Sequence, residues 1–237
     1  MHIVGLDIGY SERRRTNAMA IIRDRALTVM NPMSPSERDT MLRSFDAVDV
    51  IAIDAPIVPR GTPDDFVRKC EHIFICGPFQ RRCKPGMSHV GGTGQRLRAE
   101  GRRAADVAES VARTVVEAFP NAFLGVVLPE EAFANPPKLR RGGKFDWLYD
   151  EWRRRGLFRR VTAAAHLPEE IAIACETEEN HERRAALVCL LTAAFALQER
   201  CTVVGQPADG FFLPPAELWE AWALASLPVH ISETSSC

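Results

Sequence analysis

The sequence lacks the long apolar segments that membrane spans and export signals require. No run among its 237 residues approaches the roughly 18 uncharged apolar residues of a transmembrane helix. Its N-terminus has no basic flank followed by an apolar stretch. It also has no internal repeat, and its seven cysteines include no C-x-x-C pair. We therefore expect a cytoplasmic protein with reduced thiols and no membrane partner.

The chain is long enough and apolar enough for one domain with a complete core, and its charge is unevenly distributed. Hydrophobic residues make up 46% of the chain, and its formal net charge is −1. Residues 60–160 hold 20 Lys and Arg against 12 Asp and Glu, whereas both flanking segments are acidic. This basic middle favours a polyanion such as nucleic acid as a partner, with a solvated arginine-rich surface as the alternative.

Two short segments each bring one aspartate to the end of an apolar run. Residues 2–9 read HIVGLDIG and residues 50–56 read VIAIDAP, so Asp7 and Asp54 stand where Gly or Pro ends the run. Such runs are typical of strands buried on both faces, as in parallel sheets. Neighbouring parallel strands lie about 4.8 Å apart, and chemistry collects beyond the carboxyl ends of strands in open α/β sheets. We therefore predict that Asp7 and Asp54 face one divalent-metal site.

The order of expected elements is that of a five-stranded mixed sheet. Strands over 2–8, 17–23 and 26–30 form an antiparallel meander, and a helical crossover over 34–49 makes the strand at 50–54 parallel to the first. A long helix over 93–116, a fifth strand over 115–119 and a late helix over 181–199 follow. This order predicts an α/β, ribonuclease H-like fold with antiparallel strands 1–3 and parallel strands 4–5, flanked by helices and interrupted by insertions.

Two segments interrupt this order. Residues 57–93 are rich in Cys and Arg but too apolar for disorder, so we predict that they fold back over the site as a cap. Residues 129–178 form a second insertion before the last long helix, with helices expected over 145–155 and 168–176. We expect residues 1–237 to form a single domain that includes both insertions.

Six short segments, taken in order, carry a family resemblance. They are GLDIG at 5–9, IDAP at 53–56, RRCKPGMS at 81–88, VEAFP at 116–120, AALVC at 185–189 and GFFLP at 210–214. With them the chain resembles, over nearly its whole length, a domain-of-unknown-function family (number four-two-nine in that naming scheme) of predicted ribonuclease H-like nucleases. The resemblance implies a hydrolase that cleaves phosphodiester bonds in nucleic acid, with Mg²⁺ or Mn²⁺ bound by Asp7 and Asp54.

Ribonuclease H-like nucleases also carry a third acidic group, and this sequence offers several. Glu117 is a lone carboxylate in the apolar fifth strand, and we slightly favour it as the third catalytic residue beside Asp7 and Asp54. Glu182 and His181, at the start of the late helix, are the alternative metal ligands, although capping or packing also suits them. Arg184 stands where resolvase-like relatives tend to carry Asp, so the chain departs from the pattern there.

A basic segment and a glycine-rich segment contribute candidate phosphate ligands. Arginine, lysine and serine side chains form charge-assisted or neutral hydrogen bonds with phosphate oxygens, and a glycine-rich entry into a helix can receive an anion. The segment at 91–96 lacks the Lys-Ser/Thr ending of a P-loop, which argues against ATP hydrolysis of that class. The candidates for contacts with substrate phosphate are Arg81, Arg82, Lys84, Ser88 and Arg96.

The cysteines of the first insertion raise the question of a zinc site. Cys70, Cys76 and Cys83 could ligate zinc, but five and six residues separate them, and paired C-x-x-C spacing is missing. We therefore favour small buried thiols in a cap over a zinc site.

Two other classes of function stay open. A non-catalytic module of the same fold, binding nucleic acid or protein, is supported by Arg184. A nucleotide-binding relative of actin-like or sugar-kinase-type phosphotransferases would share the G-x-D-x-G ending of the first strand, but such proteins need a second copy of the domain, which we do not find. Trp219 and Trp222 could belong to the core or to a homodimer interface.

Overall fold

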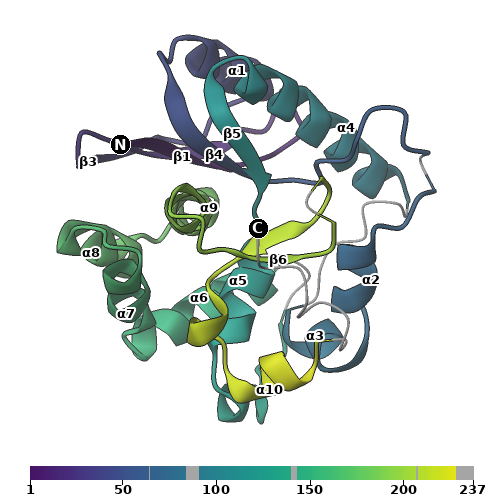
Figure 1. Ribbon diagram of the computed structural model, residues 1–237, viewed down its shortest axis with the longest axis vertical. Coiled ribbons are helices and arrows are strands. Elements are labelled where there is room, and N and C mark those ends of the chain that lie inside the picture. The colour runs from purple at the N-terminus through teal and green to yellow at the C-terminus, as the bar shows by residue number, and fades with distance from the viewer. Residues whose placement is uncertain (64, 84–90, 140–142, 207, 228–237) are drawn as a thin grey trace.

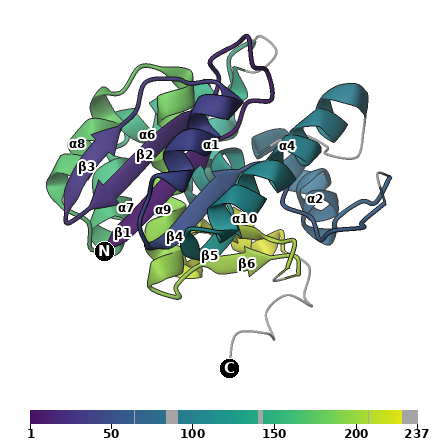
Figure 2. The same ribbon diagram turned by 90° about the horizontal axis from the view of Figure 1, so that it is seen from above.

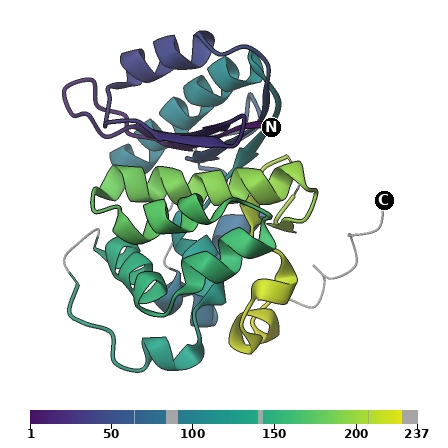
Figure 3. The ribbon, with the colours of Figure 1, turned by 90° about the vertical axis from the view of Figure 1, so that its left-hand side faces the viewer.

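The computed structural model describes residues 1–63, 65–83, 91–139, 143–206 and 208–227, and its elements form layers (Figures 1 and 3). A five-stranded mixed sheet forms one layer. Helices α1 (Pro35–Arg43) and α4 (Gly91–Glu109) cover one face of the sheet, and α9 (His181–Leu197) covers the other. Most of the remaining helices lie beyond α9, in the lower part of Figure 3.

The strand order of the sheet is β3-β2-β1-β4-β5 (Figure 2). β1 (His2–Asp7), β2 (Ala18–Arg23) and β3 (Ala26–Val29) form the predicted antiparallel meander. β4 (Val48–Asp54) runs parallel to β1, and β5 (Ala112–Glu117) runs parallel to β4. The prediction of a mixed α/β sheet with these strand directions is therefore confirmed.

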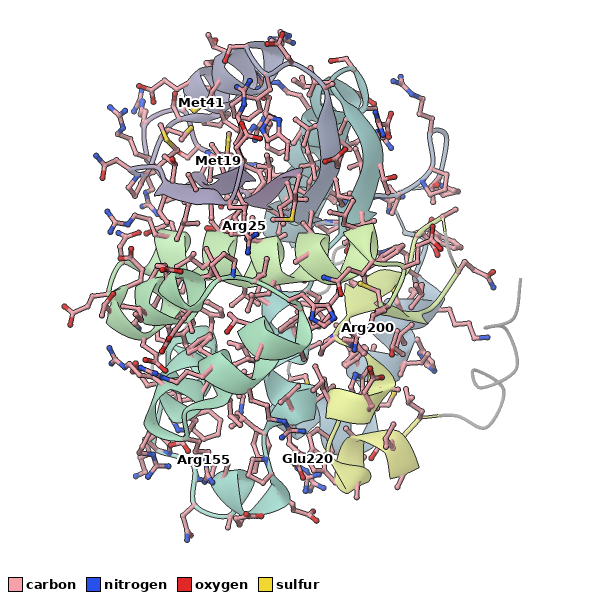
Figure 4. All side chains as sticks on the ribbon, turned by 60° about the vertical axis from the view of Figure 1, so that its left-hand side comes forward. Met19, Arg25, Met41, Arg155, Arg200 and Glu220 are labelled. Atoms are coloured by element: carbon pink, nitrogen blue, oxygen red, sulfur yellow. The ribbon has the colours of Figure 1, made fainter. Side chains whose placement is uncertain are left out.

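The two faces of the sheet pack against different helices. On one face, Leu6 and Ile53 lie in a cluster with Met19 and the apolar side of α4; Figure 4 shows Met19 and Met41 on this side, with α9 on the other. On the α9 face, a Cβ built on Gly5 would lie 2.1 Å from the backbone nitrogen of Leu190. The backbone of α9 thus lies directly on β1, and only glycine fits there.

Several expected boundaries differ from the structure. The helix expected over 93–116 ends at Glu109, and the fifth strand begins earlier than expected, at Ala112. The described part of the first insertion, for which no helix was predicted, contains α2 (Lys69–Phe74) and α3 (Gly77–Arg82). α5 (Pro120–Val127) was not expected, because it is buried around most of its surface and so lacks an amphipathic period.

The second insertion and the C-terminal part add short elements around this core. The insertion holds a 3-10 turn, η1 (Glu130–Phe133), followed by α6 (Lys144–Arg154), α7 (Leu157–Ala164) and α8 (Glu169–Thr177). β6 (Thr202–Val204) and β7 (Phe211–Leu213) form an antiparallel pair, followed by η2 (Ala216–Leu218) and α10 (Ala221–Ala225).

The two tryptophans considered for a dimer interface lie inside the chain. Trp219 and Trp222 are buried, and their indole N–H groups donate hydrogen bonds to the carbonyl oxygens of Pro214 and Leu128, both at 2.8 Å. They therefore contribute to the core. None of the helices in the described residues combines the length and the hydrophobicity that crossing a bilayer requires.

Candidate active site

Asp7 and Asp54 end the two central strands side by side. In the parallel register of β1 and β4, Asp7 is the direct partner of Asp54. Side chains alternate along a strand, so Asp7 projects toward the same side as Gly5, which faces α9. Asp54 lies beside it on that face. The expected meeting of these two carboxylates at one edge of the sheet is confirmed.

The surroundings of this pair disfavour negative charge. Burial raises the pKa of Asp7 well above its ordinary value, and the charges of Asp54 and Glu182 raise it further. Burial also raises the pKa of Asp54 to about 7, and the charge of His181 offsets part of that rise. Within the described residues, neither carboxylate has an arginine or lysine as an ion-pair partner. In the described part of the chain, His181 is thus the cationic group that acts on this acidic pair.

A cavity of about 600 Å³ opens beside Asp7. His181 and Glu182, from the first turn of α9, form one wall, and Leu97 of α4 contributes to another. The loop that joins β1 to β2 supplies Arg14, Tyr10 and several smaller groups. Figure 3 shows this loop and the N-terminal end of α9 on the same side of the molecule. The structure thus brings Asp7 together with both alternative metal ligands, His181 and Glu182.

The first turn of α9 is anchored by hydrogen bonds to its neighbours. The side chain of Asn180 caps the helix by accepting a hydrogen bond from the N–H of Arg183 at 3.0 Å. The Nδ1 atom of His181 lies 2.9 Å from Oδ2 of Asp146 on α6. Arg184 donates to the carbonyl oxygen of Glu178 at 2.8 Å and packs over the ring of Tyr149. Arg184 therefore binds the neighbouring helices instead of lining the cavity.

The loop that leaves Asp7 is held by a buried polar network. The N–H of Gly9 donates to Oδ1 of Asn17 at 3.1 Å, and the side chain of Asn17 donates to the carbonyl oxygen of Met33. Arg38, itself fully buried, donates to the same Oδ1 at 3.0 Å. A Cβ on Gly9 would lie 1.9 Å from Oγ1 of Thr16, so the tight return of the loop requires glycine.

Glu117 does not join the two aspartates. In the register of β4 and β5, Glu117 is paired with Ile53, one residue before Asp54. Its side chain therefore projects from the face of the sheet opposite to Asp7 and Asp54. There it accepts hydrogen bonds from the N–H of Ile57 at 2.6 Å and from Arg68 at 2.5 Å. Burial raises the pKa of Glu117, and Arg68 offsets part of the rise. This environment accounts for Glu117 as a buried ion-pair partner.

The predicted phosphate ligands lie apart from the Asp7 cavity. Arg81 and Arg82 end α3, where Arg82 forms an ion pair with Glu130, and Arg96 is exposed on α4. None of these three lines the cavity at Asp7. Lys84 and Ser88 lie outside the described residues. Arg14, which does line the cavity, was missed as a site residue; its signal was the run of three arginines in the loop after the first aspartate.

Within the described residues, no group of three or more His, Cys, Asp and Glu side chains is arranged to hold a metal ion. Cys70 and Cys83 are buried whereas Cys76 is exposed, and burial raises the pKa of Cys70 to about 12, which disfavours the thiolate that zinc requires. Asp7 and Asp54 are a different case. Two adjacent carboxylates suit Mg²⁺ or Mn²⁺, which take their remaining ligands from water and substrate phosphate.

A comparison of the chain with protein-family models, curated proteins and solved structures found no match. Function is therefore inferred from the residues and the geometry described above.

Proposed function

We propose that this protein hydrolyses phosphodiester bonds in nucleic acid with the help of a divalent metal ion. The observation that carries the proposal is the direct pairing of Asp7 with Asp54 beside a cavity that also receives Glu182. Two carboxylates of raised pKa, without an arginine or lysine as an ion-pair partner among the described residues, gain stability from a bound cation. A ribonuclease H-like fold and kinship with the family named above belong to the same proposal, supported by the strand order and by the place of the two aspartates in it.

The residues around the cavity divide into metal-binding and substrate-binding groups. Asp7 and Asp54 would hold Mg²⁺ or Mn²⁺, and Glu182 is the acidic group next to them. When bound, such an ion activates water and stabilises the charge that develops on the phosphate. Arg14 is exposed at the cavity, where it can form charge-assisted hydrogen bonds with a substrate phosphate. Asp146 holds His181 through Nδ1, which leaves Nε2 for a ligand of the cavity.

A cleavage assay tests the proposal. The purified protein is incubated with single-stranded, duplex and branched nucleic acid in the presence of Mg²⁺, Mn²⁺ or EDTA. We expect cleavage that requires the metal ion and that Asp7→Asn and Asp54→Asn abolish. Asp24→Asn is the matched control, because Asp24 is exposed in the β2–β3 turn, at the end of the strands away from Asp7. Its positive φ of 52° also suits asparagine. Absence of cleavage, or equal cleavage by all variants, would contradict the proposal.

One observation favours a second candidate function. Because no three-ligand metal group is present in the described residues, the same cavity could serve binding without hydrolysis. A non-catalytic module would bind nucleic acid or protein but leave phosphodiester bonds intact. The same assay separates the two candidates when binding is measured alongside cleavage.

A further inference from the structure

A second cavity, of about 620 Å³, lies between α3, η1 and the start of α6. Its wall combines cationic and aromatic side chains from segments that are distant in sequence. Arg81 and Arg82 come from the end of α3, Phe133 from η1, and Lys144 from the first turn of α6.

The cations of this cavity are held against aromatic rings. The guanidinium carbon of Arg82 lies 4.3 Å from the ring centroid of Trp222, and Nζ of Lys144 lies 4.3 Å from that of Trp147. Phe133 lies between them, with both cations within 5.5 Å of its centroid. Cation–π contacts of this kind fix the direction of long basic side chains. The cavity therefore presents cations and rings in a set arrangement.

The charges of the cavity are only partly balanced. Arg82 is paired with Glu130 on η1. Arg81 is exposed, and in the described part of the chain it has no ion-pair partner. Glu131, also exposed, lines the same cavity. The site thus offers a cation for a phosphate, and a carboxylate that can accept a hydrogen bond from the amino group of a base.

The first turn of α6 connects this cavity with the candidate active site. Lys144 lines the second cavity, while Asp146, two residues later, bonds to His181 in the wall of the first. Phe145, between them, contacts the His181 ring with 5.2 Å between centroids. The first turn of α6 thus lines the second cavity and also supports His181 in the wall of the first. The two cavities are therefore linked through this turn and through His181.

We propose that the second cavity binds a base and a phosphate of a single-stranded nucleic acid whose backbone continues into the Asp7–Asp54 site. This inference rests on the proposed function and adds the form of its substrate. An unpaired base can leave its neighbours and stack on an aromatic ring or on an arginine guanidinium plane. The bases of a duplex stay stacked inside the helix and cannot enter a cavity of this kind.

Binding measurements in EDTA test the inference without cleavage. Fluorescence anisotropy is recorded with a labelled single-stranded DNA oligonucleotide, with RNA of the same sequence and with the corresponding duplex, over a range of salt concentrations. We expect tighter binding of the single strands than of the duplex. The logarithm of the binding constant falls with the logarithm of the salt concentration. Arg81→Gln should make this fall shallower by about 0.7, the value for one lost phosphate contact on a single strand. Phe133→Leu should weaken binding about tenfold through lost stacking.

Arg113→Gln is the matched control, because Arg113 is 79% exposed and lies at the start of β5, away from the strand ends that carry the site. It should bind as the unchanged protein does. Absence of binding, equal binding of duplex and single strand, or Arg81→Gln binding with an unchanged salt slope would overturn the inference. Binding that depends on Arg81 without any cleavage would support this site while contradicting the hydrolase. Cleavage together with binding that does not depend on Arg81 would support the hydrolase while contradicting this second site.

Discussion

Asp54 lies directly beside Asp7 across β1 and β4, with both carboxylates on the α9 face of the sheet. Folding therefore brings two like charges together in a partly buried place, beside the acidic first turn of α9. Such a pair costs free energy unless a proton or a cation neutralises it. A bound divalent cation or the removal of one carboxylate should therefore stabilise the folded chain.

Asp54→Asn should stabilise the metal-free protein above about pH 7. The pKa of Asp54 is raised to about 7 in the folded chain, from an ordinary value of about 4. Between these values the folded chain holds a proton that the unfolded chain releases, so stability falls as pH rises through this window. Asparagine carries no charge and avoids the loss. In EDTA, we expect the variant's Tm to exceed that of the unchanged protein at about pH 8 but not at about pH 4. The difference in Tm should be roughly 2–4 °C for each kcal/mol gained in the free energy of unfolding. An unchanged pH slope in Asp54→Asn would contradict this assignment.

Mg²⁺ or Mn²⁺ should raise the thermal stability of the unchanged protein at neutral pH. A ligand that binds only the folded state contributes about 2.7 kcal/mol at one hundred times its Kd. Asp7→Asn removes one of the two adjacent carboxylates and should lose this stabilisation, whereas Asp24→Asn should keep it. Differential scanning fluorimetry across a metal titration measures the effect. A shift of equal size in Asp7→Asn would place the metal elsewhere.

Glu182 and Glu117 should differ in their response to metal. Glu182→Gln removes the acidic group that acts on Asp7, and we expect a smaller metal-induced rise in Tm. Glu117→Gln should keep the full metal-induced rise in Tm, because Glu117 projects from the other face of the sheet. It should instead destabilise the fold by about 1–3 kcal/mol by weakening a buried charged hydrogen bond to Arg68, which retains Glu71. The reverse pattern would identify Glu117 as the third ligand.

Gly5→Ala should severely destabilise the protein, whereas Gly92→Ala should not. A Cβ at position 5 would meet the backbone of α9 at 2.1 and 2.2 Å, and a helix backbone on a sheet cannot give way locally. We expect a loss of about 3 kcal/mol or more in chemical denaturation. Position 92 lies in open space on α4, where alanine favours helix by up to about 1 kcal/mol. Similar stability of the two variants would show that α9 packs less closely on β1.

The central strands and the aspartate pair could be predicted because their signals are local. An apolar, β-branched run that ends in Asp and Gly or Pro identifies a buried strand and its end, and the crossover length makes the two strands parallel. Directions of all five strands followed from the same reasoning. The start of β5 did not, because the apolar spacing of the preceding helix continues through Val111 and Val115 and hides the break at Ser110.

The surroundings of the pair could not be predicted, because they depend on register and on non-local packing. The face on which Glu117 lies is decided by a one-residue offset between β4 and β5, which the sequence does not reveal. The roles of Arg68 and Arg184 depend on partners far away along the chain or on neighbouring helices. The contribution of Arg14 follows from the path of the loop after β1, which the buried Asn17–Arg38 contact directs.

The close packing of α9 on β1 also bears on how the protein is made. Asp7 is synthesised well before His181 and Glu182, which lie far along the chain from it. Until α9 docks, the face of β1, β2 and β4 that it covers stays exposed to water and the cavity lacks one wall. Such long-range contacts form late and slowly. The cavity beside Asp7 is therefore incomplete in a growing chain until α9 has been synthesised and has docked.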